Sequence, residues 1–209
     1  MGTEIPTIDI VDHHGAKVPT DHLEYEEQLL AHTYIEKGDT VLELGARYGS
    51  VSCRIGHKLE DKSKHIAVEP DSRVWDALET NKQVNGGSFQ IVKGFISGKK
   101  LNLTNIDYWH GGYGATSQED ENSTIPSYTL DEIVSQYGFE FNVLVADCEG
   151  FLETFLNENP ELYSKLRLLI FEADYPEKCN YDKVRSNLRQ SGFIELERGH
   201  QNVWRREIV

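Results

Sequence analysis

The stretch TVLELGARYG, residues 40–49, joins an apolar run to a turn that holds two glycines. Its first five residues have the length and apolar content of a strand buried on both faces of a sheet. Behind the turn, apolar residues recur at four-residue spacing, which predicts a helix with one buried face: Val51, Ile55 and Leu59. A strand, a glycine turn and a helix in this order are typical of the start of a βαβ unit.

The same alternation of strand-length apolar runs and helical patterns continues along most of the chain. Further strands are predicted at residues 65–69, 89–92, 142–146 and 166–171, and a terminal hairpin at 193–196 and 203–204, turning at Gly199-His200. Together with residues 40–44 these make seven strands. The sequence therefore predicts an α/β fold with a doubly wound, mostly parallel, Rossmann-like sheet and a C-terminal antiparallel hairpin.

Length and charge limit the class of protein further. A chain of 209 residues suffices for one sizeable core, so we expect a single domain over residues 1–209. Its 21 Lys and Arg against 35 Asp and Glu give a formal net charge of −14, which disfavours nucleic acid as a partner. No apolar run reaches the roughly 18 residues of a spanning helix, and the three widely spaced cysteines are typical of free thiols. We expect a soluble cytoplasmic protein without membrane contact; the sequence leaves the oligomeric state open.

Two segments lie outside the regular alternation. Residues 1–37 precede the sheet and are predicted to hold a helix that begins at a cap formed by Thr20 or Asp21 and covers either the core or a cofactor. Residues 98–127 show no long periodic element and carry aromatic residues among glycines. An insert of this length in a compact domain is usually a functional lid or a disordered loop, and we expect it on the acceptor side of the site.

Two carboxylates and two glycines mark a cofactor site at the first two strands. Glu43 lies next to the turn of Gly45 and Gly49, where a ligand can approach the backbone, and it is expected to accept a hydrogen bond from an amino group. Glu69 ends the second strand, where a carboxylate can accept hydrogen bonds from both hydroxyls of a ribose. An acceptor for an amino group and an acceptor for ribose hydroxyls together match the two ends of S-adenosylmethionine. A nicotinamide cofactor would favour Gly-x-Gly-x-x-Gly, which this turn lacks.

From about Leu23 to Gly192 the chain resembles the FkbM-like methyltransferases. The motifs that carry the resemblance are residues 42–46, 68–71, 129–132 and Ala146-Asp147-Cys148-Glu149-Gly150. The resemblance implies the class I methyltransferase fold and O-methylation of sugars or glycosylated small molecules, with a deoxyhexose such as rhamnose as the single best acceptor. By the same resemblance Glu43, Gly45 and Glu69 bind the cofactor and Gly94-Phe95 lies near the adenine. The expected cofactor site also includes the neighbouring residues Leu44, Ala46, Ser50, Pro70 and Asp71.

Two positions depart from the pattern of that family. Arg47 occupies a position where the family commonly has Asn, and Cys148 one where it commonly has a β-branched residue. The first change is expected to alter a hydrogen bond at the glycine turn, and the second to affect only packing. Neither position identifies the acceptor.

Four carboxylates follow two predicted neighbouring strands: Asp147, Glu149, Glu172 and Asp174. Methyl transfer to an alcohol requires removal of its proton, so one interpretation makes Asp147 a direct general base, with Glu149 beside it. A second places a hard divalent ion, Mg²⁺, on Asp147 with Glu172 or Asp174, where it would polarise sugar hydroxyls. In the third, the side chains are solvated strand ends and Glu149 caps the helix beginning near Phe151.

Residues of the insert supply the remaining candidates. His110 is a second possible base, although a lone histidine in a loop is more often merely exposed. Tyr108, Trp109 and Tyr113 are expected either to stack on the apolar face of a sugar ring or to anchor the insert to the core. Two other classes of protein stay open: a nucleotide-binding or nicotinamide-binding oxidoreductase on the same sheet, and a methyltransferase-like binding module without chemistry.

Overall fold

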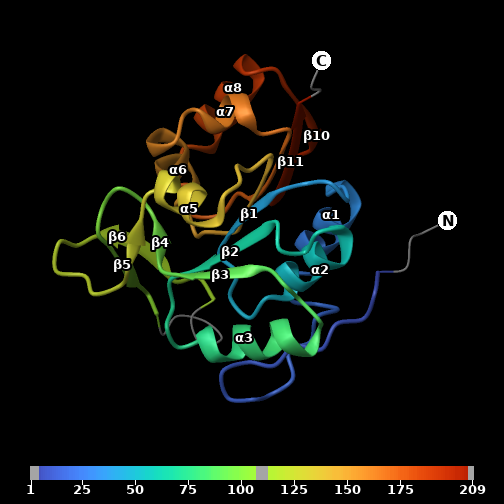
Figure 1. Cartoon of the computed structure of the whole chain (residues 1–209). Coiled ribbons are helices and arrows are strands. Elements are labelled where there is room, and N and C mark those ends of the chain that lie inside the picture. Colours follow the sequence, from blue (N-terminus) through green and yellow to red (C-terminus); the bar gives the residue numbers. More distant parts are fainter. Residues whose placement is uncertain (1–4, 107–112, 207–209) are drawn as a thin grey trace.

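The computed structural model describes residues 5–106 and 113–206, and its centre is a seven-stranded sheet of order β10-β11-β9-β8-β1-β2-β3 (Figure 1). These strands are β1 (Val41–Leu44), β2 (His65–Glu69), β3 (Gln90–Lys93), β8 (Val143–Ala146), β9 (Leu168–Glu172), β10 (Phe193–Glu197) and β11 (Gln201–Arg206). The five strands from β3 to β9 are parallel, and β11 is antiparallel to both of its neighbours. The predicted sheet and its terminal hairpin are confirmed.

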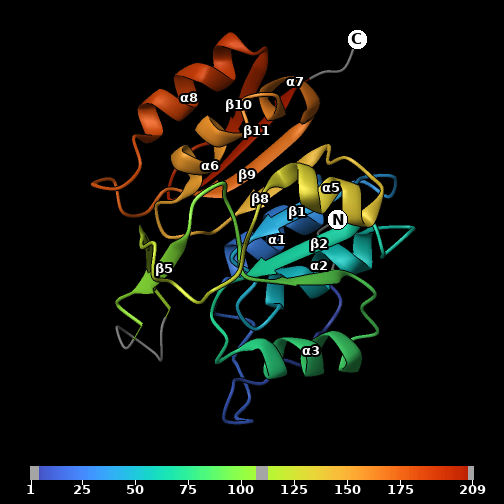
Figure 2. The ribbon, with the colours of Figure 1, turned by 60° about the vertical axis from the view of Figure 1, so that its left-hand side comes forward.

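Helices cover both faces of this sheet (Figures 1 and 2). One face carries α1 (Tyr25–Tyr34), α2 (Ser50–Lys58) and α3 (Trp75–Val84). The other carries α5 (Leu130–Tyr137), α6 (Leu152–Glu158), α7 (Leu162–Lys165) and α8 (Tyr181–Gln190). Within the described ranges, no helix has both the length and the apolar character that crossing a membrane requires.

Side-chain alternation along β1 explains why two separate layers of helix pack on it. Val41 lies in a core cluster with Val51 and Ile55 of α2, while Leu42 lies in the cluster that contains Phe155 of α6 and Leu188 of α8. Successive side chains of a strand point to opposite faces, so one apolar run supplies both cores. The helical stripe predicted behind the glycine turn is confirmed by these contacts.

The first helix begins later than the sequence predicts, and neither Thr20 nor Asp21 caps it. Residues 20–24 form turns, and α1 starts at Tyr25 behind Glu24, whose φ of 53° is left-handed and whose side chain makes no capping bond. The main-chain oxygens of Thr20 and Leu23 instead accept hydrogen bonds from the side chain of Gln28, each at 3.0 Å. These bonds tie the turn at residues 20–24 to α1, but they do not cap the amides of its first turn.

The segment at 98–127 contains short strands that its sequence did not predict. β5 (Leu101–Thr104) pairs antiparallel with β6 (Thr116–Glu119), and β4 (Phe95–Ile96) pairs parallel with β7 (Ser127–Tyr128). Leu101 is buried in the same core cluster as Leu42, which ties the β5–β6 pair to the body of the protein. The strands are too short for periodicity to distinguish them from loop, because four residues contain only two apolar positions.

Candidate functional site

A cavity of about 740 Å³, including the part open to solvent, lies at the carboxyl ends of β1, β2 and β8. Ligands bind at this edge of open parallel sheets, where the strand order reverses. The wall includes six of the residues predicted to bind the cofactor: Leu44, Gly45, Glu69, Pro70, Asp71 and Phe95. Other residues on the same wall were not predicted to bind the cofactor: Glu24, Arg47, Val68, Ile96, Cys148 and Phe151.

Gly45 allows the backbones of two strands to meet beneath this cavity. Its amide and that of Ala46 both donate hydrogen bonds to the main-chain oxygen of Val68, at 3.1 and 3.0 Å. A Cβ at position 45 would lie 1.7 Å from the main-chain oxygen of Asp147, and the φ of Gly45 is 90°. Any larger residue would push β1 and the end of β8 apart, so this glycine is required for the fold as well as for ligand approach.

Glu69 presents a fixed carboxylate on the cavity wall. Its Oε2 accepts the amide hydrogen of Arg47 and its Oε1 that of Asp71, both at 2.7 Å. Burial raises the pKa of Glu69 to about 7, although these two hydrogen bonds oppose the shift. An ionised carboxylate has about four acceptor positions, so each oxygen keeps one for a further donor. The arrangement suits a pair of neighbouring hydroxyls.

Arg47 adds a buried cation to the same turn. Its Nη1 donates to Oδ2 of Asp71 at 3.1 Å, and its guanidinium lies 4.8 Å from the ring centres of both Tyr48 and Tyr113. The backbone of Arg47 is left-handed, with a φ of 45°. The departure from Asn at this position was visible in the sequence, but the contact with Tyr113, which lies in a distant segment, was not.

Glu43 lies away from this cavity, on the face of the sheet that α2 covers. Its Oε2 accepts a hydrogen bond of 2.6 Å from Oγ of Ser52 and lies 2.8 Å from Nε2 of His65. Both Glu43 and His65 are buried. Among the described residues that line the cavity, Glu43 is absent.

Four other residues predicted to bind the cofactor also lie behind the described wall of the cavity. Ala46 packs in a core cluster, and Gly49, with a φ of 84°, begins α2. Ser50 Oγ donates a short hydrogen bond to Oε2 of Glu24. The amide of Gly94 donates to the main-chain oxygen of Glu69 at 3.0 Å. These residues therefore support the segments that line the cavity and do not line it themselves.

A second cavity, of about 1080 Å³ with its open part, adjoins the first. The two cavities share four wall residues: Glu24, Tyr113, Asp147 and Glu149. The rest of the second wall consists of His22, Leu23, Gly114, Glu172, Asp174 and Tyr175. Two adjoining cavities with a shared wall suit a reaction between two bound molecules.

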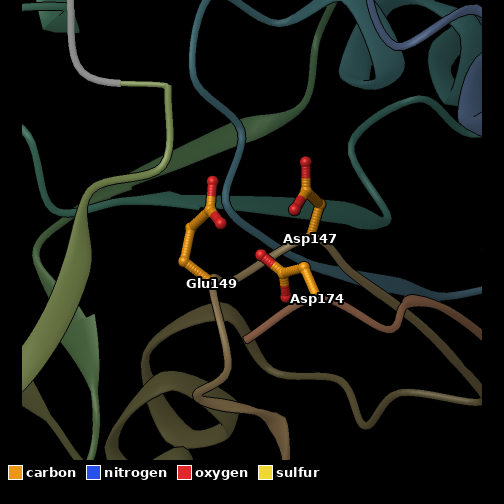
Figure 3. A group of neighbouring side chains, drawn as sticks. All are labelled: Asp147, Glu149 and Asp174. Carbon is orange, nitrogen blue, oxygen red and sulfur yellow. The ribbon is translucent and has the colours of Figure 1, made fainter. Parts of the chain in front are cut away.

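Three carboxylates converge in the second cavity (Figure 3). Asp147, Glu149 and Asp174 each offer an oxygen within 4.8 Å of the others. Oδ1 of Asp147 and Oδ2 of Asp174 are inaccessible to solvent and accept no hydrogen bond from the described residues, while Oε1 of Glu149 accepts the amide hydrogen of Gly114 at 2.8 Å. The group therefore has unused acceptor capacity at buried atoms.

Burial and mutual repulsion raise the pKa values of these carboxyl groups. Burial raises the pKa of Asp147 well above its usual range, and the charges of Glu27 and Glu172 add to the shift. Burial also raises the pKa of Glu149 to about 9, and the neighbouring carboxyl group of Asp174 adds to the shift. Carboxyl groups in this state hold a proton readily, or they bind a cation that relieves the repulsion.

Glu172, which the sequence proposed as a metal ligand, lies outside this group of three. One of its oxygens lies 2.8 Å from Nε2 of His200, and the other accepts a hydrogen bond of 2.6 Å from the side chain of Gln201. Glu149 occupies the third position instead. The sequence analysis placed Glu149 either beside Asp147 as a catalytic residue or at a helix cap, and it did not include Glu149 in the metal set; α6 begins behind Phe151 without a side-chain cap.

Tyr113 is the one predicted acceptor residue that the described ranges contain. Its ring packs on Arg47 and on Tyr48, and its hydroxyl is buried without a hydrogen-bond partner. Burial raises its pKa. His110, Tyr108 and Trp109 lie outside the described residues.

The fold resembles solved methyltransferases. The precorrin-6y C5,15-methyltransferase of Geobacter metallireducens GS-15 matches with a TM-score of 0.56 and 12% identity, over 96% of this chain and 97% of that chain. The ribosomal protein L11 methylase of Lactobacillus delbrueckii subsp. bulgaricus matches with a TM-score of 0.52 and 14% identity, over 89% and 80%. Fibrillarin of Aeropyrum pernix, with natively bound S-adenosyl-L-methionine, matches with a TM-score of 0.53 and 14% identity, over 98% and 84%.

These likenesses show the fold, which is that of the class I S-adenosylmethionine-dependent methyltransferases. Neither a family model nor a curated protein sequence matches this chain. Membership of the FkbM-like methyltransferases therefore stays a prediction.

Proposed function

We propose that this protein is an S-adenosylmethionine-dependent methyltransferase that methylates a hydroxyl of a sugar or glycan. The observation that carries the proposal is the pair of adjoining cavities. The first has a glycine turn and a buried carboxylate, Glu69, on its wall, and the second is lined by carboxylates and tyrosines. Asp147 lies on the wall that both share, where a methyl group would pass from donor to acceptor.

The first cavity fits the nucleoside half of the cofactor. Glu69 would accept hydrogen bonds from the two ribose hydroxyls through its unused acceptor positions. Phe95 and Ile96, on the same wall, offer apolar contact to the adenine. Neither interaction requires a side chain to move, since the amides of Arg47 and Asp71 already hold the carboxylate of Glu69 in place.

Asp147 is the proposed acceptor of the proton that leaves the hydroxyl. Its buried Oδ1 has no partner among the described residues, and its raised pKa makes it a stronger base than an exposed carboxylate. The acceptor would lie in the second cavity, with its hydroxyl between Asp147 and the methyl group. Positioning the oxygen in line with the methyl group would supply much of the rate enhancement.

A divalent ion is the second candidate for this step. Asp147, Glu149 and Asp174 form an all-oxygen set of the kind that Mg²⁺ prefers, and two of their oxygens are buried without a partner in the part of the chain that the structure describes. These residues therefore fit such an ion. When bound, it would polarise a sugar hydroxyl and lower the pKa of that hydroxyl.

A polyhydroxylated acceptor suits the second cavity better than an anionic one. Carboxylates accept hydrogen bonds from sugar hydroxyls but repel phosphate, and the net charge of −14 acts in the same direction. Tyr113 and Tyr175 lie on the wall, where aromatic side chains would contact the apolar side of a sugar. A deoxyhexose such as rhamnose, with a methyl group beside its hydroxyls, is the proposed acceptor.

Labelled S-adenosylmethionine, incubated with a panel of glycosides with and without chelator, tests the proposal. Label transferred to a glycoside hydroxyl supports it, and loss of transfer in EDTA that Mg²⁺ restores identifies the metal-dependent form. A protein that binds the methyl donor and transfers to no acceptor fits the binding-module alternative. Binding of a nicotinamide nucleotide in preference to the methyl donor would instead identify the oxidoreductase alternative.

A further inference from the structure

The amino group of the proposed cofactor needs an acceptor that lies on the cavity wall. The sequence assigns this role to Glu43, but Oε2 of Glu43 is already bonded to Ser52 and close to His65. Its carboxylate faces α2 and is not on the described wall. If the protein binds this cofactor as proposed, a carboxylate that does lie on the wall is a better candidate for the amino acid end of the ligand.

Glu24 occupies that place. It lies on the wall of both cavities, at the residue immediately before α1, and Ser50 at the start of α2 donates a short hydrogen bond to its Oε2. Ser50 directly follows the glycine turn, so Glu24 lies beside the part of the cavity that the turn borders. Glu69, whose carboxylate would hold the ribose, lies on the described wall of the first cavity only, whereas Glu24 lies on both.

A buried network fixes the backbone around Glu24. Nε of Arg54 donates to the side-chain oxygen of Gln28 at 3.0 Å, and the amide of Gln28 donates to the main-chain oxygens of Thr20 and Leu23. Both Gln28 and Arg54 are buried. This network holds Glu24 in its left-handed conformation, with a φ of 53°, which is costly for a residue other than glycine.

The surroundings of Glu24 favour a cation. Neighbouring carboxylates are Glu27, which is buried on α1, and Asp147 on the shared wall. In the described ranges no Lys, Arg or His forms an ion pair with any of these three. Burial raises the pKa of Glu24 to about 7 and the charges of Glu43 and Glu172 add to the shift, although the hydrogen bond from Ser50 and the charge of Arg47 oppose it. A bound ammonium would relieve this repulsion.

We propose that the carboxylate of Glu24 receives the α-ammonium of S-adenosylmethionine, and that Glu43 instead holds β1 to α2 through Ser52. In this arrangement Glu24 binds the amino acid end and Glu69 the ribose. Glu24 comes from outside the sheet, so the segment before β1 takes part in forming the cofactor site.

Binding measurements with two ligands test this assignment. S-adenosylhomocysteine carries the ammonium, while 5′-S-(3-carboxypropyl)-5′-thioadenosine is the same molecule without its amino group. Glu24→Gln should lower the affinity for S-adenosylhomocysteine by about 10- to 100-fold, as expected for loss of a hydrogen bond between charged groups. The same substitution should change the affinity for the deaminated ligand less than about threefold. As a control, Glu26→Gln changes an exposed residue in the first turn of α1, two positions from Glu24, and should alter neither affinity.

The two ligands also separate the possible failures. If wild-type protein binds neither ligand, the proposed function is wrong. If it binds S-adenosylhomocysteine and Glu24→Gln leaves the difference in affinity between the two ligands intact, Glu24 is not the ammonium acceptor. The same conclusion follows if Glu43→Gln removes that difference in affinity. Should Glu24→Gln fail to fold, Glu24→Asp keeps the charge and withdraws it by one methylene, and the same selective loss is expected at smaller size.

Discussion

Asp147→Asn separates the chemical role of this residue from its effect on stability. The substitution keeps the shape of the side chain and removes its charge. As the general base, Asp147 would contribute about a hundredfold to ten-thousandfold in rate, so kcat should fall by that factor while the affinity for S-adenosylhomocysteine stays within about threefold of wild type. Single-turnover transfer of labelled methyl to a saturating acceptor measures the change.

The same substitution should stabilise the protein. Burial and the charges of Glu27, Glu172 and Glu149 raise the pKa of Asp147, so its ionised form is less favourable in the folded state than in the unfolded state. Asn removes that charge, and its amide can donate to the neighbouring carboxylates. A gain of about 1 kcal/mol corresponds to a rise in Tm of about 2–4 °C for a protein of this size. Calorimetry at pH 7.5 measures it.

Lower activity combined with higher stability is the expected signature, because active-site charges are often costly to the fold. A conserved kcat would show that Asp147 does not act in the chemical step, and His110 would then be the next base to test. A fall in both kcat and Tm would show that the side chain supports the fold, since loss of structure lowers both quantities.

Three further predictions follow from the site. Glu69→Ala should greatly reduce the rise in Tm that millimolar S-adenosylhomocysteine causes, because the ligand stabilises only the state it binds; an unchanged rise would exclude Glu69 from the site. Changing Trp109 and Tyr113 together to Ala should raise the acceptor KM and spare cofactor affinity, and the opposite pattern would assign them to the cofactor. The third concerns pH, because Glu69 has a pKa of about 7 in the folded state against its usual 4.5. Between these two pH values Glu69 is ionised in the unfolded protein but still protonated in the folded protein, so the free energy of unfolding falls as pH rises. The free energy of unfolding of Glu69→Gln, measured by urea titrations from pH 4.5 to 7.5, should therefore decline less steeply with pH than that of wild type. Parallel plots of this free energy against pH would contradict the raised pKa.

Local pattern alone predicts most of the central sheet. The apolar runs at β1, β2, β8 and β9 are long enough to be read as buried strands, and the stripe of Val51 and Ile55 indicates which face of α2 packs inward. The glycine turn after β1 is also visible in the sequence. These features depend on residues within one or two turns of one another, so no tertiary information is needed to find them.

Short elements and helix ends were less predictable. No side chain caps α1, and the turn before it is bonded to Gln28, which itself contacts Arg54 of α2, so a search for a capping side chain selects the wrong residue. β5 and β6 become recognisable only through their pairing with each other, since neither is long enough to show a period. In contrast, Thr129 and Glu132 do form a capping box, because both partners lie within one turn of α5.

The sequence by itself determined which edge of the sheet would hold the site, since Glu69, Asp147 and Asp174 all follow strands and parallel strands end on one side. Only the tertiary structure decided which carboxylates meet there. Glu149 joins Asp147 and Asp174, Glu172 turns to His200, and Glu43 is held by Ser52 behind the wall. Glu24, far from any motif, reaches both cavities. Spacing along a strand specifies where a side chain starts, but its direction and partners depend on packing between segments distant in the chain.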